Sequence, residues 1–243
     1  MKKLVSLFTV ALLAVGQVHA VDEARLTQAL NSADRPAADK ERDASRQPVA
    51  VLSFLGLEEG MTALDIMAST GWYTEVLSYA VGPNGTVLMQ NSPASLGMRN
   101  TEAGVQERLA GNRLPNVQRV NQGFDSLGIE SGSVDFALTA LNFHDLYNGN
   151  PAAAQAMLAA VKDVLKSGGI LGIIDHRGNV GADNASLHRI TLDEVAQAVT
   201  EAGFVITGVS DVLHADDDPR TTGPFDQSLG RNTDRIVVRA MKP

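Results

Sequence analysis

The sequence predicts an α/β protein with a doubly wound, mostly parallel sheet that is covered by helices on both faces. The main observation is an alternation of short apolar runs with longer helix-like segments, because parallel strands need helical crossovers between them. The segment ALDIMASTGWYTEVL, residues 63–77, shows the repeating unit best, as a buried strand, a turn of small residues and a helix. Polar residues also gather where the expected strands end, and open parallel sheets bind ligands there.

The expected elements follow one another along a single domain, residues 47–243, preceded by a polar helical leader over residues 21–46. Strands are expected over 61–67, 85–90, 117–121, 133–141, 170–175, 204–212 and 235–241. Helices are expected over 47–57, 73–81, 101–110, 151–165 and 191–202, the last opened by a capping box of Thr191 and Glu194. A loop joins the last two strands, which predicts an antiparallel hairpin at one edge of the sheet.

Residues 1–20, MKKLVSLFTVALLAVGQVHA, have the three parts of a secretory signal peptide. A basic start at Lys2 and Lys3 is followed by an apolar run, and Val18 to Ala20 forms a small-x-small cleavage site. The apolar run is too short for a stable membrane span. We therefore expect an exported, periplasmic protein that begins at Val21, with a retained N-terminal anchor as the alternative.

Composition limits the classes of partner. The formal net charge is −8, and cleavage of the signal would remove two further positive charges. An acidic protein is poorly suited to nucleic acid, since phosphates demand a basic surface. The chain contains no Cys, so it has neither a disulfide nor a lipid-modified cysteine. A small molecule is therefore the expected partner, and no pattern indicates an oligomeric state.

Candidate site residues stand after the expected strands, where the carboxyl ends of parallel strands meet at one edge. In chain order they are Asp65, Ser69, Thr70, Gly71, Gln90, Asn91, Asp125, Asn142, His144, Asp145 and His176. The strand interiors are apolar, so the repetition of polar residues at strand after strand is harder to explain by chance than any one residue. The sequence thus predicts one ligand site that draws on several strands.

Three histidines make this prediction more specific. His144 and His176 each adjoin an aspartate and follow strands expected to be neighbours, and His188 lies just before the helix at 191–202. Imidazole titrates near neutral pH and can act as a general base. Together with aspartate it also binds divalent metals. Each histidine alone is more often structural, but as a group they indicate either proton transfer or metal binding.

The chain resembles class I S-adenosylmethionine-dependent methyltransferases, and within them a bacterial group of exported predicted methyltransferases. The resemblance is carried by SADRPAADKERDASRQP, GMTALDIMASTGWYTEVL, SGSVDFALTALNFHDLY, LKSGGILGIIDHR, SLHRI and FDQSLGRNTDRIVVRAMKP. It implies a Rossmann-like sheet of seven strands with a reversed final strand. It also implies S-adenosyl-L-methionine as the cofactor and methyl transfer to a small-molecule acceptor.

The resemblance further implies a binding mode for the cofactor. The turn from Asp65 to Gly71 would hold the methionine part, Gln90 or Asn91 would lie near the ribose, and Asp125 would lie near the adenine. This chain departs from the family at the turn, where Met67 and Ser69 stand in place of the usual glycines. It departs again at Gln90, which stands in place of an acidic residue.

For the transfer itself, the resemblance implies that Asn142, His144 and Asp145 face the methyl group. His176 would lie across the pocket, and His144 would take a proton from the acceptor. A second hypothesis keeps the scaffold without this reaction. In that case an exported binding protein or metal-dependent enzyme would use His144, His176 and His188, which the altered turn and the expected compartment favour.

Overall fold

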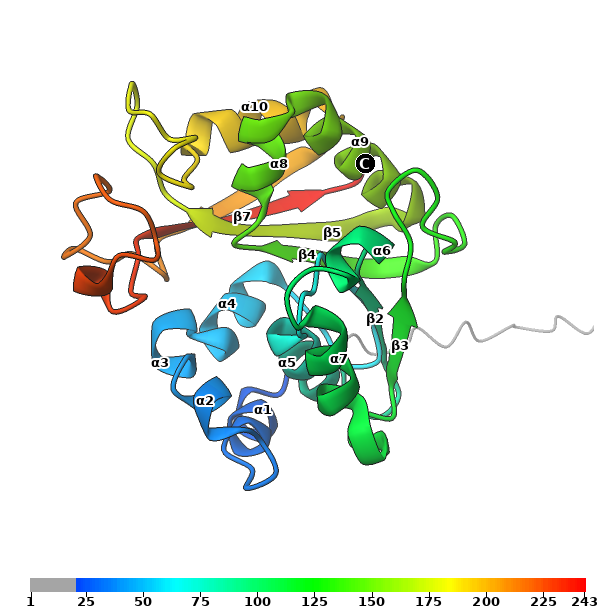
Figure 1. Cartoon of the computed structure of the whole chain (residues 1–243). Helices are drawn as coiled ribbons and strands as arrows, with labels where there is room; N and C mark the ends of the chain where they lie inside the picture. Colours follow the sequence, from blue (N-terminus) through cyan, green and yellow to red (C-terminus); the bar gives the residue numbers. More distant parts are fainter. Residues whose placement is uncertain (1–20) are drawn as a thin grey trace, which may run out of the picture.

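Figure 1 shows the computed structural model of the chain, which describes residues 21–243. The predicted signal peptide, residues 1–20, lies outside the described residues. One twisted sheet runs through the molecule, and helices cover both of its faces (Figure 1). The doubly wound α/β class predicted from the sequence is therefore confirmed.

The sheet has seven strands in the order β3-β2-β1-β4-β5-β7-β6. The strands are β1 Thr62–Ile66, β2 Thr86–Gln90, β3 Val117–Val120, β4 Val134–Ala140, β5 Leu165–His176, β6 Val205–Ser210 and β7 Arg235–Met241. The neighbours from β3 to β5 pair in parallel, whereas β7 runs antiparallel to both β5 and β6. The reversed final strand and the hairpin at one edge are both confirmed.

Ten α-helices surround the sheet within residues 21–243. They are α1 Glu23–Leu30, α2 Ala37–Lys40, α3 Asp43–Arg46, α4 Pro48–Leu55, α5 Trp72–Val81, α6 Pro93–Leu96, α7 Thr101–Leu109, α8 Phe143–Gly149, α9 Pro151–Val164 and α10 Leu192–Glu201. Helices α8, α9 and α10 lie over one face, and α1, α4 and α5 lie over the other (Figure 1). Thr191 opens α10 with the predicted capping box.

The core consists of two apolar clusters, one on each face of the sheet. Successive strand residues alternate between them, so that Ala63 packs with α4 and α5 while Leu64 packs with α9. In β4 the same alternation separates Phe136 from Ala137. Burial on both faces explains why the central strands are mostly apolar and do not alternate strictly between apolar and polar residues.

The leader, residues 21–46, contains α1, α2 and α3 and packs directly on the rest of the chain. Leu26 and Leu30 are buried in the same cluster as α4 and α5. The guanidinium of Arg25 donates to the backbone oxygens of Tyr79 and Ala80, at 2.7 Å and 3.0 Å, near the end of α5. A cation there suits the carbonyl end of a helix. The leader therefore packs against α5, the helix that connects β1 to β2.

Strand β5 differs from its prediction by beginning at Leu165, five residues earlier than expected. Gly168, at φ +79°, lets the chain bend without leaving the sheet. Its backbone N–H donates to the oxygen of Lys242 at 2.8 Å, and the N–H of Lys242 donates to Gly169 at 2.9 Å. These partners come from the end of the chain, so local sequence could not reveal the extension. No membrane-spanning helix is found among residues 21–243, because none combines sufficient length with sufficient apolarity.

Two loops beyond the sheet, residues 177–190 and 211–234, are joined by a buried ion pair. They are the yellow and orange-to-red loops of Figure 1. Arg189 binds Asp218 through two hydrogen bonds of 2.9 Å each, and both side chains are fully buried. Arg189 also donates to the backbone oxygens of Arg177 and Thr222. One side chain thereby fixes both loops at the end of β5.

We expect Arg189→Ala to lower the free energy of unfolding by about 3–5 kcal/mol, because it would leave the Asp218 carboxylate buried without its cation. Chemical denaturation would measure the loss. Arg119→Ala is the matched control, since Arg119 pairs with Glu102 near the surface and should matter far less. Equal losses for the two variants would contradict the account.

Candidate functional site

The turn after β1 keeps the backbone path of a glycine-rich loop although two of its positions carry side chains. Met67 and Ser69 both have φ +53°, and Gly71 has φ +83°. This left-handed region favours glycine, and other residues pay roughly 1–3 kcal/mol of strain there. The positions that differ from the expected glycine pattern are therefore the ones that hold the glycine-like conformation.

Two buried amide side chains hold this turn in place. Gln90 accepts from the N–H of Met67 at 2.9 Å, and Asn91 accepts from the N–H of Ser69 at 2.9 Å. Asn91 also donates to the oxygen of Ser69, while Gln90 donates to the oxygen of Gln122. Both residues end or follow β2, so they join the β1 turn to the neighbouring strand. Their predicted proximity to a ribose stays a prediction.

The far side of the turn is fixed by α7. Arg108 donates to the backbone oxygen of Thr70 and forms ion pairs with Glu75 and Asp39. A Cβ at Gly71 would lie 2.8 Å from side-chain carbons of both Arg108 and Met89. Glycine is therefore required at position 71 by the backbone conformation and by the neighbouring side chains. Helix α5 begins directly after it.

Asp65 lies beneath the turn and is almost completely buried. Its carboxylate accepts a hydrogen bond from the hydroxyl of Thr74. Burial raises the pKa of Asp65 to about 7, and this rise is partly offset by the bond from Thr74 and by the charges of Arg108 and Arg46. Asp125, by contrast, is exposed in the loop after β3.

Arg46, which the sequence analysis did not single out, lies beside the same turn. Its guanidinium carbon is 4.4 Å from the ring centroid of Trp72 and 5.5 Å from that of Tyr73. These two aromatic residues open α5, directly after Gly71. Burial lowers the pKa of Arg46 to about 10. The only signal in the sequence was its place in the SADRPAADKERDASRQP segment, and the structure puts it at the end of α3.

A second group forms around Asp175, which is fully buried at the end of β5. Its carboxylate accepts the backbone N–H of His144 at 2.7 Å and the backbone N–H of His176 at 2.8 Å. It also lies 2.7 Å from Nδ1 of His144. Because a carboxylate only accepts, Nδ1 carries the proton, and Nε2 is the ring nitrogen left to face the site.

His144 continues this chain of contacts outward. Its Nε2 is 3.2 Å from Oδ1 of Asp145, and the same oxygen is 2.9 Å from Nδ1 of His188. Burial lowers the pKa of His144, but hydrogen bonds to Asp145 and Asp175 outweigh it and raise the value to about 9. The bond from His144 correspondingly lowers the pKa of Asp145 to about 2. The structure therefore brings together His144, Asp145 and His188.

His176 lies beside this group but has a partner of its own. Its ring centroid is 5.7 Å from that of His144, and its Nδ1 is 2.7 Å from the hydroxyl of Thr233. Burial, helped by the nearby charge of Arg235, holds the pKa of His176 well below its usual value. Its side chain is therefore neutral, and it does not belong to the His144, Asp145 and His188 cluster of possible metal ligands.

Asn142 connects the two groups. It accepts from the hydroxyl of Thr139 in β4 and donates to the backbone oxygen of Met67, at 3.2 Å. The turn after β1 and the residues after β4 are thus hydrogen-bonded to each other. The predicted residues from the first, second, fourth and fifth strands meet at one edge, whereas Asp125 lies on an exposed loop.

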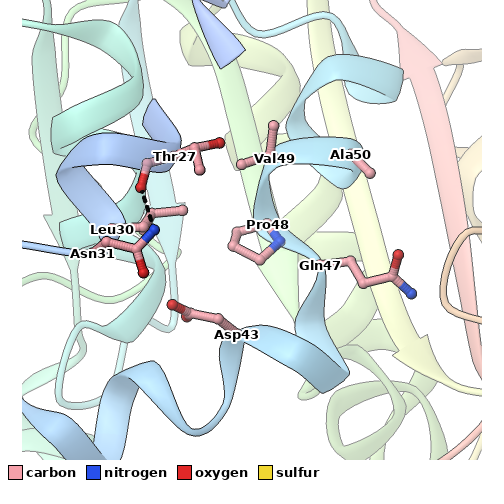
Figure 2. Close-up of a pocket in the computed structure, with 8 residues that line it drawn as sticks. All are labelled: Thr27, Leu30, Asn31, Asp43, Gln47, Pro48, Val49 and Ala50. Atoms are coloured by element: carbon pink, nitrogen blue, oxygen red, sulfur yellow. Dashed lines mark hydrogen bonds between the residues drawn. The ribbon is translucent and has the colours of Figure 1, made fainter. Parts of the chain in front are cut away.

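A separate cavity of about 290 Å³ lies between the leader and α4. Figure 2 shows the residues that line it: Thr27, Leu30, Asn31, Asp43, Gln47, Pro48, Val49 and Ala50. None of them is a predicted site residue. We therefore place the candidate site at the strand ends and not in this cavity.

Comparison with solved structures identifies the fold. A SAM-dependent methyltransferase from Aquifex aeolicus superposes with a TM-score of 0.64 at 22% identity, covering 91% of this chain and 99% of that one. Geranyl diphosphate C-methyltransferase from Streptomyces coelicolor, crystallised with S-adenosyl-L-homocysteine, gives 0.60 at 14% identity, covering 93% and 91%. The chain therefore has the Rossmann-like fold of class I methyltransferases.

A third similar structure is an enzyme named for a different activity. The 4+2 cyclase SpnF superposes with a TM-score of 0.60 at 17% identity, covering 93% of this chain and 86% of that one. No protein-family model and no curated protein matches the sequence. Identities this low establish the fold alone, so the reaction has to be argued from the site.

The buried carboxyl of Asp65 predicts a pH-dependent stability. Its pKa rises from 3.8 to about 7 on folding. The folded chain therefore binds this proton more tightly, and the stability from Asp65 falls as the pH rises from about 4 to about 7. Asp65→Asn removes this dependence. We expect the variant to gain roughly a few kcal/mol relative to the unaltered chain between pH 4 and pH 8.

Urea denaturation at pH 4, 6 and 8 would measure that gain. Asp125→Asn, at an exposed carboxylate, controls for the loss of one negative charge. A difference between Asp65→Asn and the unaltered chain that does not change with pH would contradict the prediction.

Proposed function

We propose that the protein transfers a methyl group from S-adenosyl-L-methionine to a small-molecule acceptor. The observation that carries this proposal is the left-handed backbone at Met67 and Ser69, because it preserves a tight cradle where the sequence has lost the glycines. The methyltransferases among the similar structures share the surrounding fold. When bound, the cofactor supplies an electrophilic methyl group.

In this proposal the cofactor lies across the turn from Asp65 to Gly71. Ser69, Thr70 and Gly71 bring backbone close to its methionine part, with Gln90 and Asn91 on the ribose side and Asp125 toward the adenine. Arg46 adds a positive charge beside the turn, where the carboxylate of an amino acid could pair with it. The cation stacks on Trp72 and so is held in place before the cofactor arrives.

On the acceptor side, positioning dominates, because methyl transfer is an in-line displacement. Asn142 bonds to the turn and lies two residues before His144 in the chain, so it couples the two halves of the site. Asp175 fixes the ring of His144, and Nε2 is the atom that could receive a proton from the acceptor once the ring is neutral, which requires a pH above its pKa of about 9. Asp145 and His176 would complete the wall around the methyl group.

We further propose that the protein is exported after cleavage behind Ala20. Val21, the residue that would become the N-terminus, is buried, and its backbone nitrogen donates to Leu57 at 3.2 Å. Cleavage at this position would keep the contact intact.

Intact-mass analysis of protein recovered from the periplasmic fraction should give a chain that starts at Val21. An Ala20→Arg variant, in which the small residue of the cleavage site is lost, should accumulate with residues 1–20 attached. Recovery of both proteins uncut from the cytoplasm would contradict the export proposal without touching the proposed reaction.

The cofactor assignment predicts micromolar binding of S-adenosyl-L-methionine to the purified protein, about −8 kcal/mol. Arg46→Gln should weaken binding by about tenfold or more, since it removes a charge-assisted contact. His144→Ala should leave binding unchanged, because that ring serves the acceptor side. Isothermal titration calorimetry measures all three proteins.

Arg42→Gln is the matched control, because Arg42 belongs to the same leader and lies four residues before Arg46. Its affinity should equal that of the unaltered protein. Absence of binding to the unaltered protein would contradict the proposed function, and equal losses in both arginine variants would contradict the role of Arg46.

A further inference from the structure

We infer that His144, Asp145 and His188 form a binding site for one divalent cation of the first transition row. The ligand atoms of these three residues all lie within 4.8 Å of one another. Two imidazoles and one carboxylate are a donor set that suits zinc, iron, cobalt or manganese. The third ligand is Asp145, in place of His176, which the sequence had suggested.

The distances between the donor atoms fit a single ion. Oδ1 of Asp145 is 3.2 Å from Nε2 of His144 and 2.9 Å from Nδ1 of His188. Metal–ligand distances of roughly 2.0–2.2 Å place neighbouring donors about 3 Å apart in an octahedron. The rings of His144 and His188 stand nearly perpendicular, with centroids 5.7 Å apart, so that both can face the carboxylate.

Asp175, which lies behind His144, is the kind of residue that orients a metal-binding histidine. Asp175 is fully buried and lies 2.7 Å from Nδ1 of His144. Metal-binding histidines regularly donate their second ring N–H to such a carboxylate, which orients the ring and strengthens the ligand. Asp175 thus leaves Nε2 of His144 free to coordinate and acts as a positioning residue.

His188 is held by the loop pair described above. The next residue is Arg189, whose side chain is fixed to Asp218 and whose backbone oxygen accepts from Asn148 in α8 at 2.9 Å. Helix α8 also carries His144 and Asp145. The same contacts that close the loops therefore bring the third ligand to the first two.

The site also has room for a further ligand. Asp145 and His188 are each about half exposed, at 54% and 51% for their side chains. Three protein ligands with an open side are typical of metal sites that also take a substrate or water. The cation site does not depend on the proposed function. Resting on that function, we infer in addition that the methyl acceptor carries oxygen or nitrogen donors and coordinates the ion, and that Nε2 of His144 is then a metal ligand and not the proton acceptor.

Titration of Co²⁺ into the chelator-treated protein tests the inference, because coordination by imidazole and carboxylate gives visible absorption bands. We expect one Co²⁺ per chain. His188→Ala and Asp145→Ala, both at exposed side chains, should each lower the affinity at least about 100-fold, since each removes a ligand. Asp175→Asn should lower it by about 10–100-fold.

His214→Ala is the matched control. His214 also lies between two aspartates, Asp234 and Asp216, but has no second histidine there. This variant should bind Co²⁺ like the unaltered protein. Absence of stoichiometric binding, or binding that survives His188→Ala and Asp145→Ala, would overturn the inference. So would binding that depends on His176 instead.

A parallel titration of S-adenosyl-L-methionine into the metal-free protein separates the two proposals. Co²⁺ binding without cofactor binding would leave the cation site standing and remove its role in methyl transfer. Cofactor binding without Co²⁺ binding would remove the cation site and leave the proposed function.

Discussion

The buried carboxylate of Asp175 is the interaction on which the site depends. A charge in the interior is tolerated only where it is fully hydrogen-bonded, and Asp175 meets this condition through N–H groups of His144 and His176. Those bonds fix the start of α8, the tautomer of His144 and the direction of the chain leaving β5. The ends of β4 and β5 are thereby held together, which places His144 and His176 at the same edge of the sheet.

The turn after β1 is also held by buried hydrogen bonds, and there they stabilise a left-handed backbone. Glycine would reach the left-handed conformation without strain, but Met67 and Ser69 reach it because Gln90 and Asn91 bind their N–H groups. Strain of this kind persists only where the surroundings over-determine the backbone. Gln90 thus has a structural reason to be an amide, because it must accept from one backbone group and donate to another. An acid at that position could not donate to Gln122.

The parts that the sequence predicted are those set by local pattern. The strand, turn and helix around Gly71 follow from apolar spacing and small residues, and the mostly parallel sheet follows from the alternation of strands and helices along the chain. The parts it missed depend on partners far away in the chain. Strand β5 extends to Leu165 because of Lys242, and Arg189 is buried because of Asp218. The pairing of Asp145 with His188 required α8, a short helix without a clear periodic signal.

The proposed function divides the site into a cofactor half and an acceptor half, and this division explains why the shared fold alone does not set the reaction. The cofactor half is built from β1, β2 and their turns, which belong to the sheet that this chain shares with methyltransferases and with a cyclase. The acceptor half is built from α8 and from loops anchored by Arg189, and these segments lie outside the sheet. Asn142 joins the two halves through its hydrogen bond to the backbone oxygen of Met67, so a shift of the turn after β1 would also move the residues after β4. We therefore propose that the chemistry particular to this chain resides in His144, Asp145 and His188, which lie outside the sheet that the similar structures share.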